Sequence, residues 1–168
     1  MPDKETLERA RKDAEQGKSA STQAGEFVRE EMDHIREGKH GARSTKQAIA
    51  IGLSKARRAG VRLGTPAKGK VSAKTRKKIQ QDNRKGSSSR RKTRSATRSR
   101  ATSQALKREG HKAASRTSLA RQARSSAKKR GASARRKSAM KAVRTKGERG
   151  LKLEARKAAA TRERRRAA

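Results

Sequence analysis

The stretch STKQAIAIGLSKARRAG, residues 44–60, has the clearest structural pattern in the chain. It opens with Ser-x-x-Gln, the spacing of a helix capping box. It closes on a glycine, the residue that most often follows a helix. Between these ends Ile49, Leu53 and Ala56 recur at intervals of three and four residues, which places them on one face of a helix. The stretch therefore predicts an amphipathic helix over residues 45–59.

A second amphipathic helix is predicted upstream, ending near residue 37. Its apolar side chains also repeat at three and four residues, and Gly38 follows as a helix stop. Val61 and Leu63 lie where they can fold back over both helices. We therefore predict a helical hairpin at residues 20–63, small enough that self-association would help to stabilise it. Its predicted core residues are Phe27, Val28, Met32, Ile35, Ile49, Leu53 and Ala56.

Charge is divided unevenly along the chain. Residues 1–37 hold 10 of the 15 Asp and Glu residues and 7 Lys and Arg, whereas residues 38–168 hold 44 Lys and Arg and 5 acids. Only 29% of the residues are hydrophobic and Phe27 is the one aromatic, too little to offset the ordering entropy of the whole chain. The expected fold class is mostly α with extensive disorder: a small helical hairpin followed by a basic, conditionally helical tail.

Four parts are expected along the chain. Residues 1–19 form a polar N-terminal helix or arm, and residues 20–63 form the hairpin. Residues 64–103 are a basic linker rich in Ser and Arg. Residues 104–168 are a tail rich in Ala, Lys and Arg, whose helices are expected to form when phosphates relieve the repulsion between like charges.

The block at residues 44–60, with Lys39-His40-Gly41 ahead of it, resembles a family of small basic bacterial proteins of unassigned function. These proteins share a core similar to K-S-x-K-Q-A-I-A-I-A-L-S-E-A-R. Gly52 and Lys55 stand where that core has Ala and Glu. The resemblance implies no reaction. Separately, residues 68–168 are similar in composition to the Lys/Ala-rich tails of bacterial histone-H1-like proteins.

The motifs of enzymes and metal sites are not matched. Residues 64–71 approach a phosphate-binding loop, but Val71 takes the place of the Ser or Thr that such a loop needs for magnesium. The chain has no Cys, and His34 and His40 are six residues apart, which matches no usual pair of ligands. We expect no catalytic residues, no metal site, no cofactor and no small-molecule substrate, and hence no enzyme.

The targeting signals are equally sparse. No run of apolar residues approaches the roughly 20 that span a bilayer, and the polar N-terminus lacks the apolar segment of a secretory signal. No stretch joins a basic face to a strong apolar face, so no membrane binding is expected. A cytoplasmic, nucleoid-associated protein is the expectation.

The basic residues carry the functional prediction. A net charge of +36 far exceeds what solubility requires, and nucleic acid is the commonest cellular polyanion. Arg supplies 29 of the 51 basic residues, which favours bidentate phosphate contacts and insertion into the minor groove. The basic region has no aromatic residue for base stacking, which favours duplex DNA over single strands, and duplex DNA is preferred to RNA as the partner.

The predicted function is therefore non-enzymatic, largely sequence-independent DNA binding by a histone-like protein that neutralises phosphates. The alternatives are an RNA- or ribosome-associated basic protein, and a protein-interaction module at residues 20–63 that the tail localises. The acids of residues 26–37 either solubilise the hairpin or pair with the tail. The residues predicted to contact phosphate are Arg57, Arg58, Arg62, Lys68, Lys70, Lys74, Arg76, Lys77, Lys78, Arg90, Arg91, Lys92, Arg94, Arg98, Arg100, Lys128, Lys129, Arg130, Arg135, Arg136, Lys137, Arg164, Arg165 and Arg166.

Overall fold

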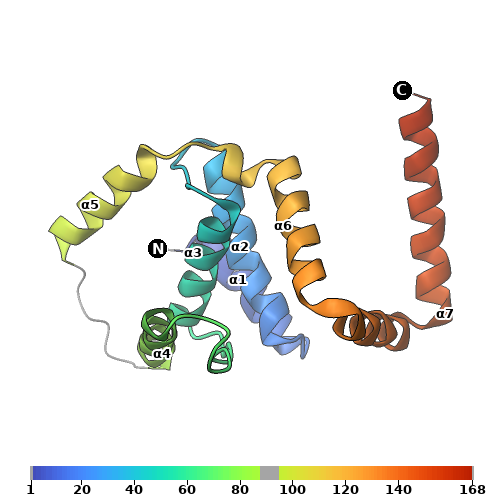
Figure 1. The fold of residues 1–168 in the computed structure, drawn as a ribbon, viewed down its shortest axis with the longest axis horizontal. Coiled ribbons are helices and arrows are strands. Elements are labelled where there is room, and N and C mark those ends of the chain that lie inside the picture. The colour runs from blue at the N-terminus through green and yellow to red at the C-terminus, as the bar shows by residue number, and fades with distance from the viewer. Residues whose placement is uncertain (1, 88–94, 168) are drawn as a thin grey trace. The chain divides into compact units, whose positions relative to one another are not determined.

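The computed structural model describes residues 2–87 and 95–167, and this part of the chain is all-α (Figure 1). It divides into two units, residues 1–122 and residues 123–168. The elements in chain order are α1 (Lys4–Glu15), α2 (Ala20–Arg36), α3 (Thr45–Arg58), α4 (Ala73–Ser87), α5 (Ala96–Lys107), the 3₁₀ turn η1 (Lys112–Ala114), α6 (Arg116–Lys129) and α7 (Gly131–Arg166).

The predicted fold class is wrong in its extensive disorder and its conditional helicity. The parts of residues 64–103 and 104–168 that the structure describes are largely helical, as α4 to α7. Their Ala, Arg, Lys and Gln residues are strong helix formers, and the sequence argument gave like-charge repulsion too much weight against that propensity. Short-range pairs also relieve the repulsion in places, as between Lys152 Nζ and Glu148 Oε1 at 2.7 Å.

Local sequence signals set the ends of α2 and α3. The Ser44 side chain accepts a hydrogen bond from the Gln47 amide at 3.3 Å, and the Gln47 side chain accepts one from the Arg43 amide at 2.9 Å. This is a capping box in which the return bond reaches one residue further back than usual. Gly38 has φ 75°, a conformation that glycine adopts without strain.

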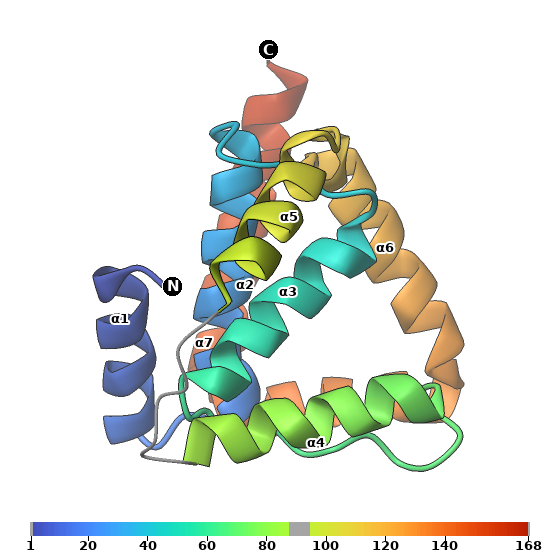
Figure 2. The ribbon, with the colours of Figure 1, turned by 90° about the vertical axis from the view of Figure 1, so that its left-hand side faces the viewer.

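The core of the first unit lies between α2 and α3, with α1 packed on α2 (Figure 2). Phe27 and Ile35 of α2 are 1% and 0% exposed. The two helices approach closely at Gly52, where an added Cβ would lie 2.7 Å from Val28 Cα. A Cβ at this position would therefore push the two helices apart. Two apolar clusters result, one around Met32, Ile35, Ala42, Ala48, Ala113 and Ala114, the other around Ala10, Ala24, Phe27 and Ala56.

The chain returns to the α2–α3 loop some 65 residues later, at residues 106–114. Gly41 N–H donates to the Leu106 carbonyl at 2.9 Å, and the Thr45 hydroxyl donates to the Ala113 carbonyl at 2.7 Å. A Cβ on Gly41 would overlap the Glu109 carbonyl, so the two backbones meet without side chains between them. Ala113 and Ala114 are buried there, which extends the core beyond the helical hairpin.

Polar contacts hold α4 against the C-terminal end of α3 (Figure 2). Asp82 is 3% exposed and accepts a hydrogen bond from Ser54 Oγ at 2.7 Å. Asn83 donates to the Leu63 carbonyl at 3.1 Å. Gly86 passes so close to the backbone of Arg57 that a Cβ would overlap its carbonyl oxygen. α4 is therefore held by the Asp82 carboxylate, by the Asn83 side-chain amide and by the close backbone approach at Gly86.

The second unit contains the end of α6 and the whole of α7. None of the described α7 side chains is buried, and Met140, Val143 and Leu153 are 63%, 48% and 53% exposed. Gly147 has φ 62° and ψ 178°, so α7 is two helical segments joined by a kink (Figure 1). Helix propensity, not packing, accounts for the helices of this unit.

Candidate nucleic-acid interface

The predicted phosphate-contacting residues divide by exposure. Arg57 is buried, Arg76 is half-buried, Arg165 belongs to α7, and residues 90, 91, 92 and 94 lie outside the described residues. The others are exposed: Arg58, Arg62, Lys68, Lys70, Lys74, Lys77, Lys78, Arg98, Arg100, Lys128, Lys129, Arg130, Arg135, Arg136, Lys137, Arg164 and Arg166.

The seven residues of the predicted hairpin core also differ in exposure. Phe27, Met32, Ile35 and Ala56 are buried, whereas Val28, Ile49 and Leu53 are partly buried and pack against the two clusters. The structure brings these residues together between α2 and α3. The basic residues, in contrast, are spread over the later helices.

The surface of α3 and α4 is basic because Asp82, the one acid of these two helices, is buried. Asp82 is buried under α4, and Arg58 Nε and Lys78 Nζ lie 4.0 and 3.9 Å from its Oδ1. Lys74 and Lys77 are exposed on the same helix. The Lys side chains of α4 are therefore open to solvent, whereas the Asp82 carboxylate is not.

Arg57 differs from its neighbours because it is only 9% exposed. Burial lowers the pKa of its guanidinium, and the nearby Asp82 carboxylate acts in the opposite direction. Among the described residues, no hydrogen-bond acceptor reaches its Nε. Arg57 is therefore placed inside the α3–α4 contact and not on the surface.

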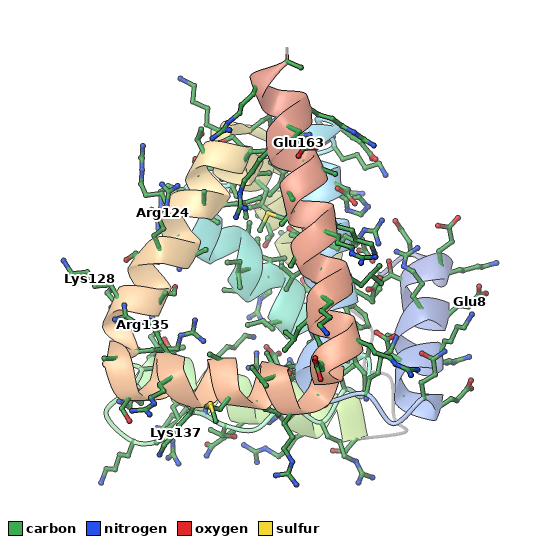
Figure 3. All side chains as sticks on the ribbon, turned by 90° about the vertical axis from the view of Figure 1, so that its right-hand side faces the viewer. Glu8, Arg124, Lys128, Arg135, Lys137 and Glu163 are labelled. Carbon is green, nitrogen blue, oxygen red and sulfur yellow. The ribbon has the colours of Figure 1, made fainter. Side chains whose placement is uncertain are left out.

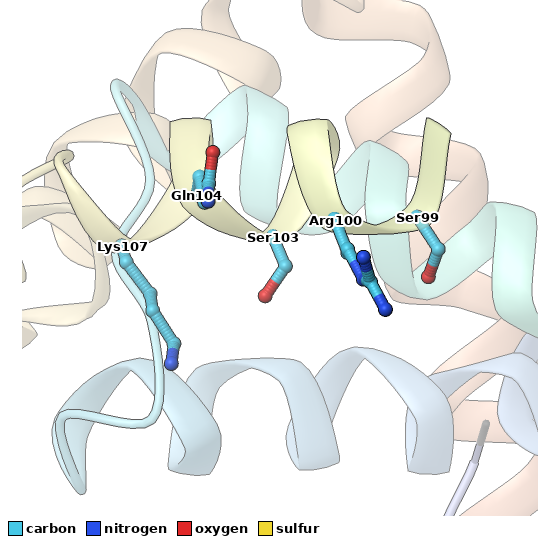
Figure 4. Close-up of a pocket in the computed structure, with 5 residues that line it drawn as sticks. All are labelled: Ser99, Arg100, Ser103, Gln104 and Lys107. Carbon is cyan, nitrogen blue, oxygen red and sulfur yellow. The ribbon is translucent and has the colours of Figure 1, made fainter. Parts of the chain in front are cut away.

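One face of α5 carries five polar side chains that can all donate hydrogen bonds. Ser99, Ser103 and Lys107 are four residues apart, and Arg100 and Gln104 run beside them, so that they line an open depression (Figure 4). All five come from a single helix, so the feature is a helix surface and not an enclosed pocket. Ammonium, guanidinium, amide and hydroxyl groups are the donors that contact phosphates in protein–DNA complexes.

The outer face of α6 was missed in the sequence prediction except for its last turn. Arg121, Arg124 and Lys128 are exposed and three and four residues apart, so they share one face. Leu119, which packs against the core of the first unit, lies on the opposite side of this helix. Figure 3 shows Arg124 and Lys128 pointing outward from α6. Their spacing was the signal, but the prediction selected runs of adjacent cations instead.

The acids of the N-terminal helices are largely engaged with nearby cations. Arg9 Nε lies 2.7 Å from Glu26 Oε2, and Arg36 Nη1 lies 3.1 Å from Asp33 Oδ1. Glu30 and Glu31 are 4% and 0% exposed. These contacts leave few of the α2 carboxylates available for pairing with the basic helices.

A buried ionic cluster between α2 and α3 was also missed. Lys55 Nζ lies 2.9 Å from Glu30 Oε1 and 2.7 Å from Glu31 Oε2. Burial disfavours the charge of Lys55, but the two carboxylates outweigh it and raise the lysine pKa. Burial also opposes the charge of Glu30, and hydrogen bonds from Lys55 and from the Asp3 amide outweigh it, lowering the glutamate pKa. The sequence signal was that Lys55 follows Gly52 by three residues, which puts it on the packed face of α3.

Comparison with known proteins finds a family match for one segment of the chain. Residues 16–69 match the model of a Family of unknown function (DUF6496). The matched segment includes α2 and α3, and residues 70–168 lie beyond it. No curated protein and no solved structure matches the chain. Within the described residues, no helix is both long enough and apolar enough to cross a membrane.

Proposed function

We propose that this protein is a non-enzymatic, histone-like DNA-binding protein that neutralises backbone phosphates largely irrespective of base sequence. The observation that carries the proposal is the unequal exposure of charge after Gly38. Only 5 acids accompany 44 Lys and Arg there. Asp82 is buried, while Glu148 and Glu154 lie near Lys152 and Lys146. The exposed charge of α4 to α7 is therefore almost entirely positive.

Helical presentation supports phosphate binding because it sets the cations at fixed intervals. With a rise of about 1.5 Å per residue, Arg121 and Lys128 stand about 10 Å apart along α6. Arg124 lies between them on the same face. Each cation that contacts a phosphate releases a condensed counterion, which supplies affinity without reading the base sequence.

Duplex DNA is favoured over single strands by the position of the aromatic residue. Proteins that bind single strands stack bases on exposed aromatic side chains. Phe27 is the only aromatic in the chain, and it is 1% exposed in the α2–α3 core. Backbone contacts to a duplex need no such platform. The likeness in composition to histone-H1-like tails supports the same function and, with it, a place on the nucleoid.

The two alternatives receive less support. The apolar face of α2 and α3 packs against α1, η1 and Leu119 within the same chain, so less of it is open to a partner protein. Structured RNA offers the same phosphate charge as DNA, although its deep and narrow major groove admits side chains poorly. An RNA-associated role is therefore an outcome of the test below.

The test is a binding titration of the full chain against duplex DNA, duplex RNA and single-stranded DNA of equal length at several salt concentrations. If about 8–10 phosphates are contacted, log K should fall against log salt with a slope of about −7 to −9 for duplex DNA. Two unrelated DNA sequences should bind equally. A slope shallower than about −3, a strong preference for one sequence, or tighter binding to RNA at matched salt would contradict the proposal.

A further inference from the structure

Two histidines and a buried glutamate meet at the C-terminal end of α2 and the loop that follows it. One ring nitrogen each from His34 and His40 and one carboxylate oxygen of Glu31 lie within 4.8 Å of one another. The two imidazole rings are 6.0 Å apart between centroids and stand at 87°. Two imidazoles and a carboxylate are a ligand set that zinc takes in proteins.

The contacts of His40 direct its Nε2 toward Glu31. Nδ1 lies 3.1 Å from the Gly41 carbonyl, so this nitrogen carries the hydrogen and donates it. Nε2 then presents a lone pair, and it lies 3.4 Å from Glu31 Oε1. Two acceptors facing each other repel unless a proton or a metal cation stands between them. A separation of about 3.4 Å is also that of two ligands on a tetrahedral zinc with bonds of about 2.0–2.1 Å.

Glu31 has unused capacity for a cation. Its side chain is 0% exposed, and no hydrogen bond reaches Oε1 within the described part of the chain. Lys55 Nζ forms an ion pair with Oε2 at 2.7 Å, which leaves Oε1 directed toward His40. A buried acceptor without a hydrogen bond is costly, and such atoms often mark an absent ion.

The charge of the cluster matches a divalent ion. The carboxylates of Asp3, Glu30, Glu31 and Glu37 face the ammonium groups of Lys55 and Lys39, giving a net charge of −2 when both imidazoles are neutral. A divalent cation would bring this cluster to neutrality. We propose that Glu31, His34 and His40 form a binding site for Zn²⁺ or a similar divalent transition metal, with a fourth position open to water.

A second set shares His34 and consists of Asp3, Glu30 and His34. Its acceptors are already engaged. Glu30 receives hydrogen bonds from Lys55 and from the Asp3 amide, and the Asp3 carboxylate lies 3.0 Å from His34 Nε2. A carboxylate beyond a ligating histidine is the usual partner that orients its ring. Asp3 therefore positions His34, and the ion belongs to the first set.

The site would join the end of α2 to the loop that receives residues 106–114. His40 precedes Gly41, whose amide bonds to the Leu106 carbonyl. Metal binding would restrain the loop on which the returning chain is docked, so that zinc should raise the melting temperature of the full chain. A ligand that binds the native state but not the unfolded chain raises the melting temperature.

The experiment titrates ZnCl₂ into chelator-treated full-length protein against a chromogenic competitor, without nucleic acid. We expect one zinc per chain, with affinity about 100-fold or more lower in His34→Asn and in His40→Asn. His111→Asn removes the third histidine, which lies outside both sets, and should bind zinc within about twofold of the wild type. Asp3→Asn should weaken binding less than His40→Asn does.

Circular dichroism of each metal-free variant shows whether it is folded. X-ray absorption of the zinc-loaded wild type needs no variant, and it should show two imidazole ligands and an oxygen ligand. The proposal is overturned if the wild type takes up no zinc saturably, if the His40 variant binds as the wild type does, or if Asp3→Asn abolishes binding while His40→Asn does not. A spectrum without two imidazoles would also overturn it.

Discussion

The two units of this chain are both helical, but among the described residues only the first unit buries charged side chains. In residues 1–122 a partly buried lysine pairs with two buried glutamates between α2 and α3, and Asp82 of α4 is buried. In residues 123–168 every described charged side chain of α7 is exposed. The first unit buries some charged side chains to hold its helices together and exposes others on α4 and α5, whereas the described charged side chains of α7 are all exposed. Helix content is thus no measure of packing, and high charge is no measure of disorder.

Breaking the buried ion pair should have the largest effect on the first unit. Lys55→Met keeps the length of the side chain but leaves Glu30 and Glu31 without a cation. Removing one partner of a buried pair costs about 3–5 kcal/mol, so the free energy of unfolding should fall by that amount in urea titrations of metal-free protein. Lys46→Met, on the exposed side of α3, should change it by less than about 0.5 kcal/mol. Equal effects would show that the cluster does not stabilise the unit.

Two glycines of the first unit should respond to alanine with opposite signs. Gly52→Ala places a Cβ 2.7 Å from Val28 Cα, so α2 and α3 must separate, at a cost of about 1–3 kcal/mol. Gly25 lies on α2 with nothing within 4 Å of its added Cβ, and Gly25→Ala should stabilise by about 0.5–1 kcal/mol through helix propensity. Thermal melts followed by circular dichroism measure both. Stabilisation by both changes would mean that the helices do not cross closely at Gly52.

The docking of α4 should depend on its one carboxylate. Asp82→Asn leaves the shape unchanged but removes the charge that faces Arg58 and Lys78, and it should destabilise by about 1–2 kcal/mol. Hydrogen exchange should accelerate in α4 more than in α2. Glu148→Gln neutralises an acid on α7 that is 80% exposed, and it provides the control. An Asp82 variant with unchanged exchange in α4 would refute the proposed docking.

The smallest effect is expected at the kink of the second unit. Gly147 has a backbone conformation that suits only glycine, yet nothing lies within 4 Å of a Cβ built on it. Gly147→Ala should therefore let α7 straighten, with slightly higher helicity and no change in the unfolding of the first unit. A lower midpoint in denaturant would instead reveal that the kink is held by packing.

The sequence predicts the helices that carry large apolar and capping side chains better than it predicts the packing of alanine. The intervals between Ile49, Leu53 and Ala56, and the cap at Ser44, locate α3 to within a residue because large apolar groups and caps act locally. The burial of Ala113 and Ala114 could not be predicted in this way. Alanine has the same pattern in an exposed helix and in a core, and the hydrogen bonds that hold this segment come from distant groups: the Gly41 amide, the Thr45 hydroxyl and the Arg36 guanidinium.

The candidate site was predictable in composition but not in placement. Runs of Lys and Arg identify the basic half, yet burial of Arg57 and exposure of Arg121 depend on which face of each helix packs. The contacts of Lys55 with Glu30 and Glu31 join residues on two different helices, about 25 positions apart, and His40 meets Glu31 across the turn that follows α2. No spacing rule within one helix describes either contact.

The most direct test of the central claim, that the later helices display charge for phosphate while the first helices do not, compares two triple variants. Arg121, Arg124 and Lys128 to Gln removes three exposed cations of α6, and Lys4, Arg11 and Lys12 to Gln removes three exposed cations of α1. Each lost phosphate contact lowers the salt slope by about 1. The slope of log K against log salt for duplex DNA should become shallower by about 2–3 in the α6 variant and by less than about 1 in the α1 variant. Equal changes in the two variants, or no change in the α6 variant, would contradict the account.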